Sequence, residues 1–148
     1  MEKVADKVLI RKIEPEDADQ ISEIQSSITN TAAGIDFRRI IEQQLQRDEG
    51  IGYAAEVGGR VVGFMISSFV YGGFGLDKSA WITNFGVHPD FMAKGIGKSL
   101  ANELFKAYKQ KGIKNIFSAV PWDSVDILSF FKTLGFDRSS LINLRKDL

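Results

Sequence analysis

The chain has 148 residues, which is long enough for one domain whose core covers roughly 70% of the unfolded surface. Nineteen basic and nineteen acidic residues leave no net charge, which argues against a general affinity for nucleic acid or anionic membranes. The chain has no cysteine and one histidine, His88, which excludes disulfides, a thiolate nucleophile and a zinc site built on several imidazoles.

The N-terminal stretch MEKVADKVLIRKIEPED carries charges every few positions and contains no long apolar run. This pattern is unlike a signal peptide or a membrane span. No repeat, low-complexity tract or linker-like change of composition divides the chain. We therefore expect a single globular domain over residues 1–148, located in the cytoplasm, with neither nucleic acid nor membrane as a partner.

The first elements are a strand and two helices. Residues 7–13 alternate weakly between apolar and polar side chains, which predicts a strand. Pro15 opens a helix with one apolar face, formed by Ala18, Ile21, Ile24 and Ile28. After a polar link over residues 29–34, Asp36 is expected to cap a second helix, whose apolar stripe is Phe37, Ile40, Ile41 and Leu45. Gly50 is expected to end that helix.

The middle of the chain predicts a meander of strands. Residues 51–57 alternate, and the Gly-Gly pair at 58–59 predicts a hairpin turn into residues 60–70. The run over 60–70 is apolar on both faces, as in a central strand. A glycine-rich loop, YGGFGLDKS, leads to a further strand over residues 80–87.

The second half predicts an αβα unit and a last strand. A helix carries an apolar repeat every four residues, Ile96, Leu100, Leu104 and Tyr108, and Gly112 closes it. Residues 113–120 form a buried strand that a crossover places parallel to its predecessor. Asp123 or Ser124 caps a short helix, and a final strand is expected near 141–146. The fold class is therefore α/β, with a mixed, mainly antiparallel central sheet, one parallel βαβ unit and helices on both faces.

Residues 86–100, GVHPDFMAKGIGKSL, are the most informative segment of the chain. They run from the end of a strand through a Pro-Asp turn into a loop with Gly95 and Gly97, and a helix follows at once. Such a loop presents a row of backbone N–H groups beside the positive end of a helix dipole. The segment therefore predicts a site for a phosphate or pyrophosphate.

Two nucleotide sites fit this loop poorly. A nucleotide-hydrolysing P-loop matches Gly97-Lys98-Ser99, but Met92 stands where its first glycine belongs, and no later strand ends in an aspartate placed for magnesium. A dinucleotide fingerprint would need a third glycine where Leu100 stands, and it would need an acidic residue after the next strand.

Two spaced motifs instead resemble the GNAT N-acetyltransferase superfamily. Val87-His88-Pro89 followed by the loop over residues 92–97 is similar to that family's acyl-CoA loop, written Q/R-x-x-G-x-G/A after Val-x-Pro. The segment DSVDILSFFKTLGF is similar to its second signature, with Phe130 and the run Leu134-Gly135-Phe136 in register. The resemblance implies a GNAT-like fold over nearly the whole chain.

The resemblance also implies a cofactor and the residues that hold it. Acetyl-CoA would be the co-substrate, with no metal, and the fourth strand would diverge from the fifth so that its edge pairs with the pantetheine arm. The amides over residues 92–98 would surround the pyrophosphate. The implied cofactor-binding residues are Phe85, Gly86, Val87, Met92, Ala93, Lys94, Gly95, Ile96, Gly97, Lys98, Ser124 and Phe131.

The catalytic residues of the family do not carry over. Phe131 occupies the place of the tyrosine that protonates the leaving sulfur in many relatives, and Ala119 stands where some relatives keep a glutamate base. Met92 replaces the usual Gln or Arg, and Ser124 replaces the common Asn. The catalytic residues are therefore unknown. Asp77 and Asp123 are the nearest loop carboxylates, although both are also typical turn or capping residues. Three aromatic residues line either an acceptor-side wall or plain core: Tyr71, Phe74 and Trp81.

Two functions remain open. The first is an N-acetyltransferase that moves an acetyl group from acetyl-CoA to a primary amine of a small molecule, peptide or protein, by direct attack in a ternary complex. The second is a non-catalytic acyl-CoA-binding module or sensor with a GNAT fold. An exposed final strand would favour a homodimer in either case.

Overall fold

The structure is a computed structural model that describes residues 7–29 and 34–148. Its single sheet has the strand order β1-β2-β3-β4-β5, with bounds Val8–Lys12, Gly50–Val57, Arg60–Tyr71, Lys78–Val87 and Ile116–Ser118. The first three pairings are antiparallel, and β4 pairs with β5 in parallel. The predicted mixed, mainly antiparallel sheet with one parallel βαβ unit is confirmed.

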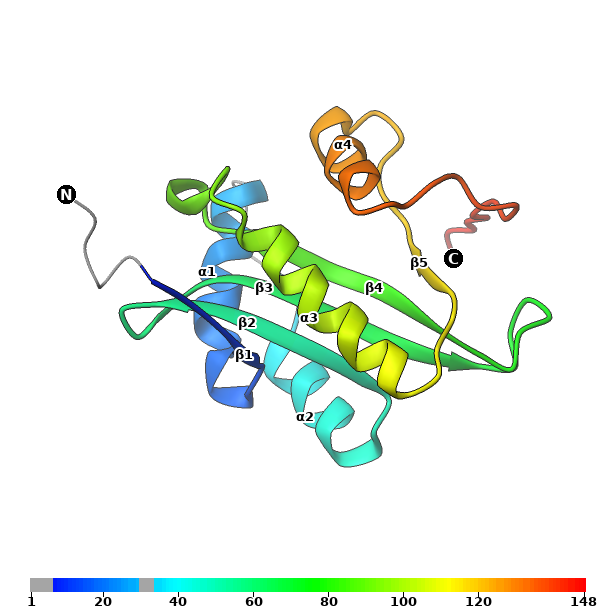
Figure 1. The fold of residues 1–148 in the computed structure, drawn as a ribbon, viewed down its shortest axis with the longest axis horizontal. Coiled ribbons are helices and arrows are strands. Elements are labelled where there is room, and N and C mark those ends of the chain that lie inside the picture. Colours follow the sequence, from blue (N-terminus) through cyan, green and yellow to red (C-terminus); the bar gives the residue numbers. More distant parts are fainter. Residues whose placement is uncertain (1–6, 30–33) are drawn as a thin grey trace.

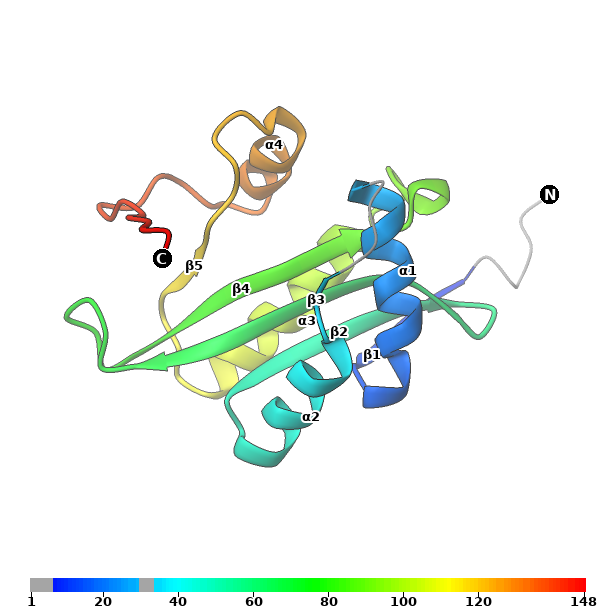
Figure 2. The same ribbon diagram turned by 180° about the vertical axis from the view of Figure 1, so that it is seen from behind.

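Helices cover both faces of this sheet (Figures 1 and 2). On one face lie α1 and α2, which span Ala18–Thr29 and Phe37–Arg47, and on the other lies α3, which spans Ile96–Gln110. The last helix, α4 (Val125–Thr133), stands beyond the sheet where β5 leaves β4. Short 3₁₀ turns, η2 (Pro15–Asp17) and η3 (Pro89–Phe91), precede α1 and the loop before α3. No helix in the described ranges is long and apolar enough to cross a membrane.

β3 contributes side chains to the cores on both faces of the sheet. Val62 and Met65 face α3, where they join a cluster with the helix residues Leu100, Leu104 and Tyr108. On the opposite face, the strand residues Val61, Phe64 and Ile66 pack against residues of α1 and α2: Ile21, Ile24, Phe37 and Ile41. The two clusters share one sheet, which is why this long strand is buried along most of its length.

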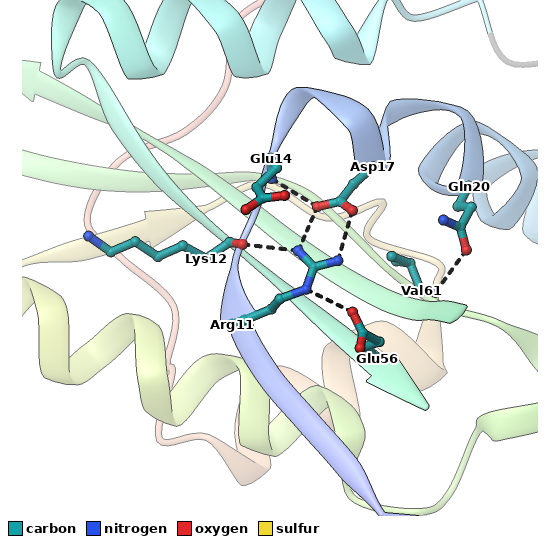
Figure 3. A network of polar contacts seen from close by, with 7 residues as sticks. All are labelled: Arg11, Lys12, Glu14, Asp17, Gln20, Glu56 and Val61. Carbon is teal, nitrogen blue, oxygen red and sulfur yellow. Dashed lines mark hydrogen bonds and ion pairs between the residues drawn. The ribbon is translucent and has the colours of Figure 1, made fainter. Parts of the chain in front are cut away.

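A buried ion pair fixes the start of α1 against the sheet (Figure 3). Both terminal nitrogens of Arg11 on β1 donate to the Asp17 carboxylate, at 2.8 and 2.9 Å, and its Nε donates to Glu56 on β2 at 2.9 Å. Burial alone would raise the pKa of Asp17, but the hydrogen bonds from Arg11 and from the amide of Glu14 outweigh it and lower that pKa. This network lies at β1 and β2, away from the parallel end of the sheet.

Several predicted boundaries shift in the structure. The helix that Gly50 was expected to end stops at Arg47, and Asp48 follows with a φ of 51°. Gly50 instead begins β2, where a β-carbon would collide with the backbone carbonyl of Ser67. Leu45 and Ile28, both predicted in apolar stripes, are exposed. The predicted link over 29–34 lies largely in residues 30–33, outside the described residues.

The predicted final strand near residues 141–146 is wrong. Residues 137–148 form neither helix nor strand, and the side chains of Ile142 and Leu144 are exposed. A strand needs a hydrogen-bonded neighbour, and a cavity separates this segment from β5. The predicted strand over 113–120 is also shorter than expected, because pairing with β4 covers only Ile116–Ser118.

Candidate cofactor site

A bulge in β4 opens the sheet at its functional end. Ile66 and Ser67 of β3 face Asn84 and Ile82, so Thr83 has no partner in the register. The extra residue reverses the alternation, since Ala80 and Ile82 face α3 before the bulge and Phe85 faces the same side after it. The parallel pairing with β5 stops at Ile82, one residue before the bulge. Beyond that point β4 and β5 diverge (Figures 1 and 2).

The diverging part of β4 has a free edge. The amide of His88 donates to the carbonyl of Val62 on β3 at 2.8 Å. Backbone groups alternate in direction along an antiparallel strand, so Gly86 also points its N–H and C=O to β3. Phe85 and Val87 therefore point theirs outward, into the gap left by β5. Phe85, Gly86 and Val87 were the three strand-edge residues proposed from sequence. Gly86 does not contribute to the free edge, because its backbone groups point to β3.

The loop after β4 is built by a turn that His88 organises. Pro89 starts η3, and the Nδ1 atom of His88 accepts a hydrogen bond from the amide of Asp90 at 3.1 Å. The imidazole ring also packs edge-on against Phe91. The single histidine is thus a half-buried capping residue rather than a solvated one, and its ring holds the loop in place.

The first turn of α3 presents free backbone amides. Ala93 and Gly95 both adopt left-handed conformations, with φ of 62° and 77°. Gly95 is the N-cap and supplies no side chain, so the first hydrogen bond into the helix runs from the amide of Ser99 to its carbonyl at 3.0 Å. Within the described residues, no acceptor takes a hydrogen bond from the amides of residues 93–98. This geometry is that of an anion site.

The charge around these amides is positive. Lys94 and Lys98 are the only charged residues from Phe91 to Asn102, and both are exposed. The ammonium of Lys94 lies 5.5 Å from the centre of the Phe91 ring. Two lysines and an uncapped helix terminus together favour a doubly charged group such as a pyrophosphate.

Aromatic rings span the gap between β4 and α4. Phe85 stacks on Phe130 with ring centres 4.8 Å apart and an angle of 5°, and Phe131 packs edge-on against both. Gly97 lies beneath this stack, where a β-carbon would come within 2.9 Å of Phe130 and 3.2 Å of Phe85. Gly97 has an ordinary helical φ, so the close approach to these rings is what requires glycine there, whereas Gly95 is required by its positive φ.

Ser124 begins α4, the helix that follows β5. Ser124 is its N-cap, but its side chain does not make the expected capping hydrogen bond. The hydroxyl is therefore free of that bond, while the amide of Ser124 donates to the carbonyl of Pro121 at 3.0 Å. Phe131, about two helical turns later, is buried and contacts Phe136 on its other side.

Burial raises the pKa of two tyrosines, Tyr53 on β2 and Tyr108 on α3, and keeps them neutral. The two loop carboxylates considered from sequence are both exposed. Asp77 is exposed in the loop that begins β4, at the end opposite the bulge, and its carbonyl closes a turn with Gly72. Asp123 is exposed beside the cap of α4.

An aromatic cluster lies on the other face of the diverging strands. Trp81 on β4 stacks on Phe117 of β5 with ring centres 5.1 Å apart, and the Phe74 ring packs at a tilt against both rings. Neighbours Ala80 and Ile82 face α3, so Trp81 faces the side of α1 and α2. Tyr71, also considered for this wall, packs on Phe69 instead.

Two polar residues of the site carry no sequence signal of their own. Thr83 at the bulge donates from Oγ1 to the carbonyl of Ile66 at 3.3 Å, and Ser118 donates from Oγ to the carbonyl of Ile82 at 3.1 Å. They hold the strands at the point where β4 and β5 separate. No group of three or more His, Cys, Asp or Glu side chains able to hold a metal occurs among residues 7–29 and 34–148.

Comparison with known proteins agrees with this geometry. A family model described as the acetyltransferase (GNAT) family matches residues 18–136. The fold is similar to a transcriptional regulator from Bacillus halodurans, with a TM-score of 0.81, 20% identity, and coverage of 96% of this chain and 100% of that one.

Two acetyltransferase structures are similar as well. The aminoglycoside N-acetyltransferase AAC(6')-Iy in complex with CoA gives a TM-score of 0.80 at 17% identity, covering 95% of each chain. A ribosomal-protein-alanine N-acetyltransferase from Brucella melitensis gives 0.75 at 20% identity, covering 96% of this chain and 99% of that one. These likenesses show the fold, and the predicted fold class is confirmed.

Proposed function

The chain belongs to the GNAT acetyltransferase family, and on that premise we propose that it is an acetyl-CoA-dependent N-acetyltransferase acting on a primary amine. The observation that carries the proposal is the combination of a free β4 edge and free amides before α3 at one end of the sheet. We further propose that residues 1–148 act as one domain, because both cores share the same sheet.

The proposed cofactor site fits CoA in two parts. The amides of residues 93–98, with Lys94 and Lys98 beside them, match the pyrophosphate in charge and in hydrogen-bond donors. The outward backbone groups of Phe85 and Val87 match the amide-rich pantetheine arm, which can add to β4 as a strand would. Ser124 offers a hydroxyl from the opposite wall. Met92 is exposed on the loop, and its amide donates to the carbonyl of Pro89 at 3.4 Å, so it is not one of the free donors.

The chemistry needs little from the protein beyond positioning. Bound acetyl-CoA supplies an activated acetyl group, which an amine takes by attack on the thioester carbonyl, while the CoA sulfur leaves as the thiolate and the amine proton passes to water. Phe85, Phe130 and Phe131 form an apolar wall beside that point and exclude water from it. The chain has no cysteine to carry the acetyl group, so direct attack in a ternary complex is favoured.

Loss of the family's tyrosine at Phe131 does not rule out catalysis. A general acid contributes about 10²–10⁴-fold, whereas holding two reactants in line is worth effective molarities of about 10⁵–10⁸ M. A thiol with a pKa of about 8.5 also leaves readily as the anion at neutral pH. Positioning by the strand edge and the loop therefore outweighs the missing acid.

The acceptor is proposed to be an amine of low pKa. Because Ala119 stands in the place of the family's glutamate base, we propose that the amine loses its proton to water. An α-amine with a pKa of about 8 is about one-tenth neutral at pH 7, and a lysine amine near 10.4 is far less so. One structure named above is an aminoglycoside N-acetyltransferase, and another is a ribosomal-protein-alanine N-acetyltransferase. A small molecule and a peptide N-terminus are therefore both candidate acceptors. The Trp81–Phe117 stack is the proposed wall on the acceptor side.

A second function has its own support. Phe131 and Ala119 stand in the places of the family's tyrosine acid and glutamate base, which fits a module that binds acyl-CoA without turnover. One protein of similar fold is described as a transcriptional regulator. Such a sensor would use the same loop and strand edge.

A thiol-release assay separates the two functions. The chain has no cysteine, so a thiol reagent reports only the CoA that is released. The panel pairs peptides with a free α-amine against the same peptides with that amine blocked and a free lysine, together with aminoglycosides. We expect release with an α-amine acceptor and intersecting initial-velocity lines. Acetyl-CoA binding by calorimetry without release on any acceptor would favour the sensor, and no binding at all would contradict both.

A further inference from the structure

The face of β4 and β5 on the side of α1 and α2 is open beside the bulge. α1 reaches the end of β4, where a β-carbon on Gly86 would meet the Ile28 side chain. Figure 2 shows α1 and α2, among the described residues, crossing the sheet away from the pairing of β4 with β5. Thr83, at the bulge, is exposed. This part of the sheet is therefore accessible to a second substrate.

Three aromatic rings form the surface of this open part. Trp81 stacks on Phe117, and the centre of the Phe74 ring lies 5.8 Å from that of Trp81 and 6.4 Å from that of Phe117. Phe74 is 59% exposed. The Nε1 atom of Trp81 is buried and has no hydrogen-bond acceptor within the described residues. The indole therefore contributes its ring surface to this face and not its N–H group.

The backbone of Phe74 is strained. Its φ is 57°, in the left-handed region that a bulky residue rarely adopts. Gly72 and Gly75 on either side also have positive φ, and the amide of Gly72 donates to the carbonyl of Asp77 at 2.7 Å. A glycine would adopt this φ at position 74 without strain. Strain of this kind clusters at ligand sites, and here it holds an aromatic ring over Trp81.

The segments that border this face carry no charge. Residues 61–76, 79–87 and 115–122 contain no Asp, Glu, Lys or Arg. A polycation such as an aminoglycoside needs carboxylates in place of its water, and a substrate carboxylate needs cations, because an unpaired charge is costly to desolvate. These segments offer neither. The face therefore suits a substrate that is neutral apart from its reacting amine.

The three rings lie close to the proposed position of the thioester. The proposed pantetheine arm runs back from the pyrophosphate along Val87 and Phe85, so its thioester end reaches the bulge at Thr83. Trp81 is two residues further along β4, which is about 7 Å at the usual rise of a strand. An α-amine that attacks at the bulge carries its own side chain within this range.

On the premise of the proposed N-acetyltransferase activity, we propose that the acceptor is an aromatic amino acid whose carboxyl group is an amide, as in a peptide with an aromatic first residue. Its side chain packs on Trp81, Phe117 and Phe74 while its α-amine attacks the acetyl carbonyl carbon. The carbon–nitrogen bond forms, the carbon–sulfur bond breaks with its electron pair going to sulfur, and the amine proton passes to water. The three rings determine specificity.

Steady-state kinetics at saturating acetyl-CoA test this substrate class with phenylalaninamide, alaninamide and kanamycin. We expect kcat/KM to be at least tenfold higher for phenylalaninamide than for the other two amines. W81A should remove most of this preference and leave the Kd of acetyl-CoA unchanged. Y71A is the matched control, because Tyr71 is an exposed aromatic residue that packs on Phe69, and it should keep the preference.

F74G removes a ring without disturbing the loop, because glycine adopts the φ of position 74 freely. This variant should keep the melting temperature and lose preference for phenylalaninamide. Equal kcat/KM for the three amines, or a preference that survives in both W81A and F74G, would overturn the inference.

A binding measurement separates failure of this inference from failure of the proposed activity. The chain has two tryptophans, so W122F leaves Trp81 as the only one. With CoA bound, the product N-acetylphenylalaninamide should change the Trp81 emission at a concentration at least tenfold lower than N-acetylalaninamide does. If acetyl-CoA binds but no amine releases CoA, the proposed activity fails, and this measurement still decides whether the rings bind an aromatic side chain. Equal binding of the two products would contradict the inference whatever the activity.

Discussion

Substituting Gly97 by valine tests whether the loop before α3 holds the cofactor. The new β-carbon would lie 2.9 Å from two carbons of Phe130 and 3.2 Å from one carbon of Phe85. Carbon atoms pack best at about 3.5–4.0 Å, so the rings or the first turn of α3 must move. Overpacking of this kind costs about 1–3 kcal/mol, partly offset by up to about 1 kcal/mol from removing a glycine inside a helix.

The movement should reach the anion site, because Gly97 belongs to the same turn whose amides are free. A hydrogen bond to a charged group is worth about 1.5–3 kcal/mol, and 1.4 kcal/mol is a factor of ten in Kd. We therefore expect G97V to bind acetyl-CoA at least tenfold more weakly by isothermal titration calorimetry. The fold should persist, with a melting temperature a few degrees lower at about 2–4 °C per kcal/mol.

Two controls make the result specific. Gly34 has no heavy atom within 4 Å of its β-carbon position, so G34V should leave both affinity and stability unchanged. In the G97V background, F130A removes the ring that clashes, and it should restore the melting temperature and part of the affinity. Wild-type affinity in G97V would refute the assignment of the loop to the pyrophosphate.

Three further changes test other parts of the structure. F131Y should raise kcat at least tenfold if the leaving thiol lacks an acid, whereas F130Y, its neighbour in the stack, should not; equal effects would show that the acid is supplied elsewhere. Because the pKa of Asp17 is lowered in the folded chain, its ion pair stabilises the fold fully above about pH 4. This stabilisation of the fold is lost as the pH falls through that lowered pKa. D17N should therefore lower the free energy of unfolding, measured with denaturant, by about 1–3 kcal/mol at pH 7, and should make it depend less on pH under acid conditions. R145A, which breaks an exposed ion pair, should leave the free energy of unfolding nearly unchanged. M92R should tighten acetyl-CoA binding a few-fold at low salt and M92L should not, and a gain that persists at high salt would contradict an electrostatic origin.

The element order and the loop followed from local patterns. The hairpin at 58–59 was predicted from its glycines, and both have positive φ in the structure. Asp36 was predicted as an N-cap, and its side chain accepts from the amide of Arg39 at 3.1 Å. These features depend on residues close together in sequence, so propensity and periodicity suffice to find them.

Features that depend on pairing between distant strands were not predictable in the same way. The bulge at Thr83 exists only relative to Ile66 on β3, and nothing in the local sequence marks it. The stack of Phe85 on Phe130 joins β4 to α4 across the gap. The wrongly predicted strand at 141–146 shows that a local pattern does not determine strand pairing. The alternation is present in the sequence, but a strand forms only beside a hydrogen-bonded partner.

The sequence by itself predicted an anion site in the loop before α3 and the order of the elements up to the last helix, because a glycine loop before a helix and an apolar period are properties of neighbouring residues. Only the tertiary structure decided where β4 and β5 separate, which backbone groups point into the gap, and that β5 and the tail stand apart around a cavity. Those decisions rest on hydrogen bonds and contacts between segments far apart in the chain, which no local pattern encodes.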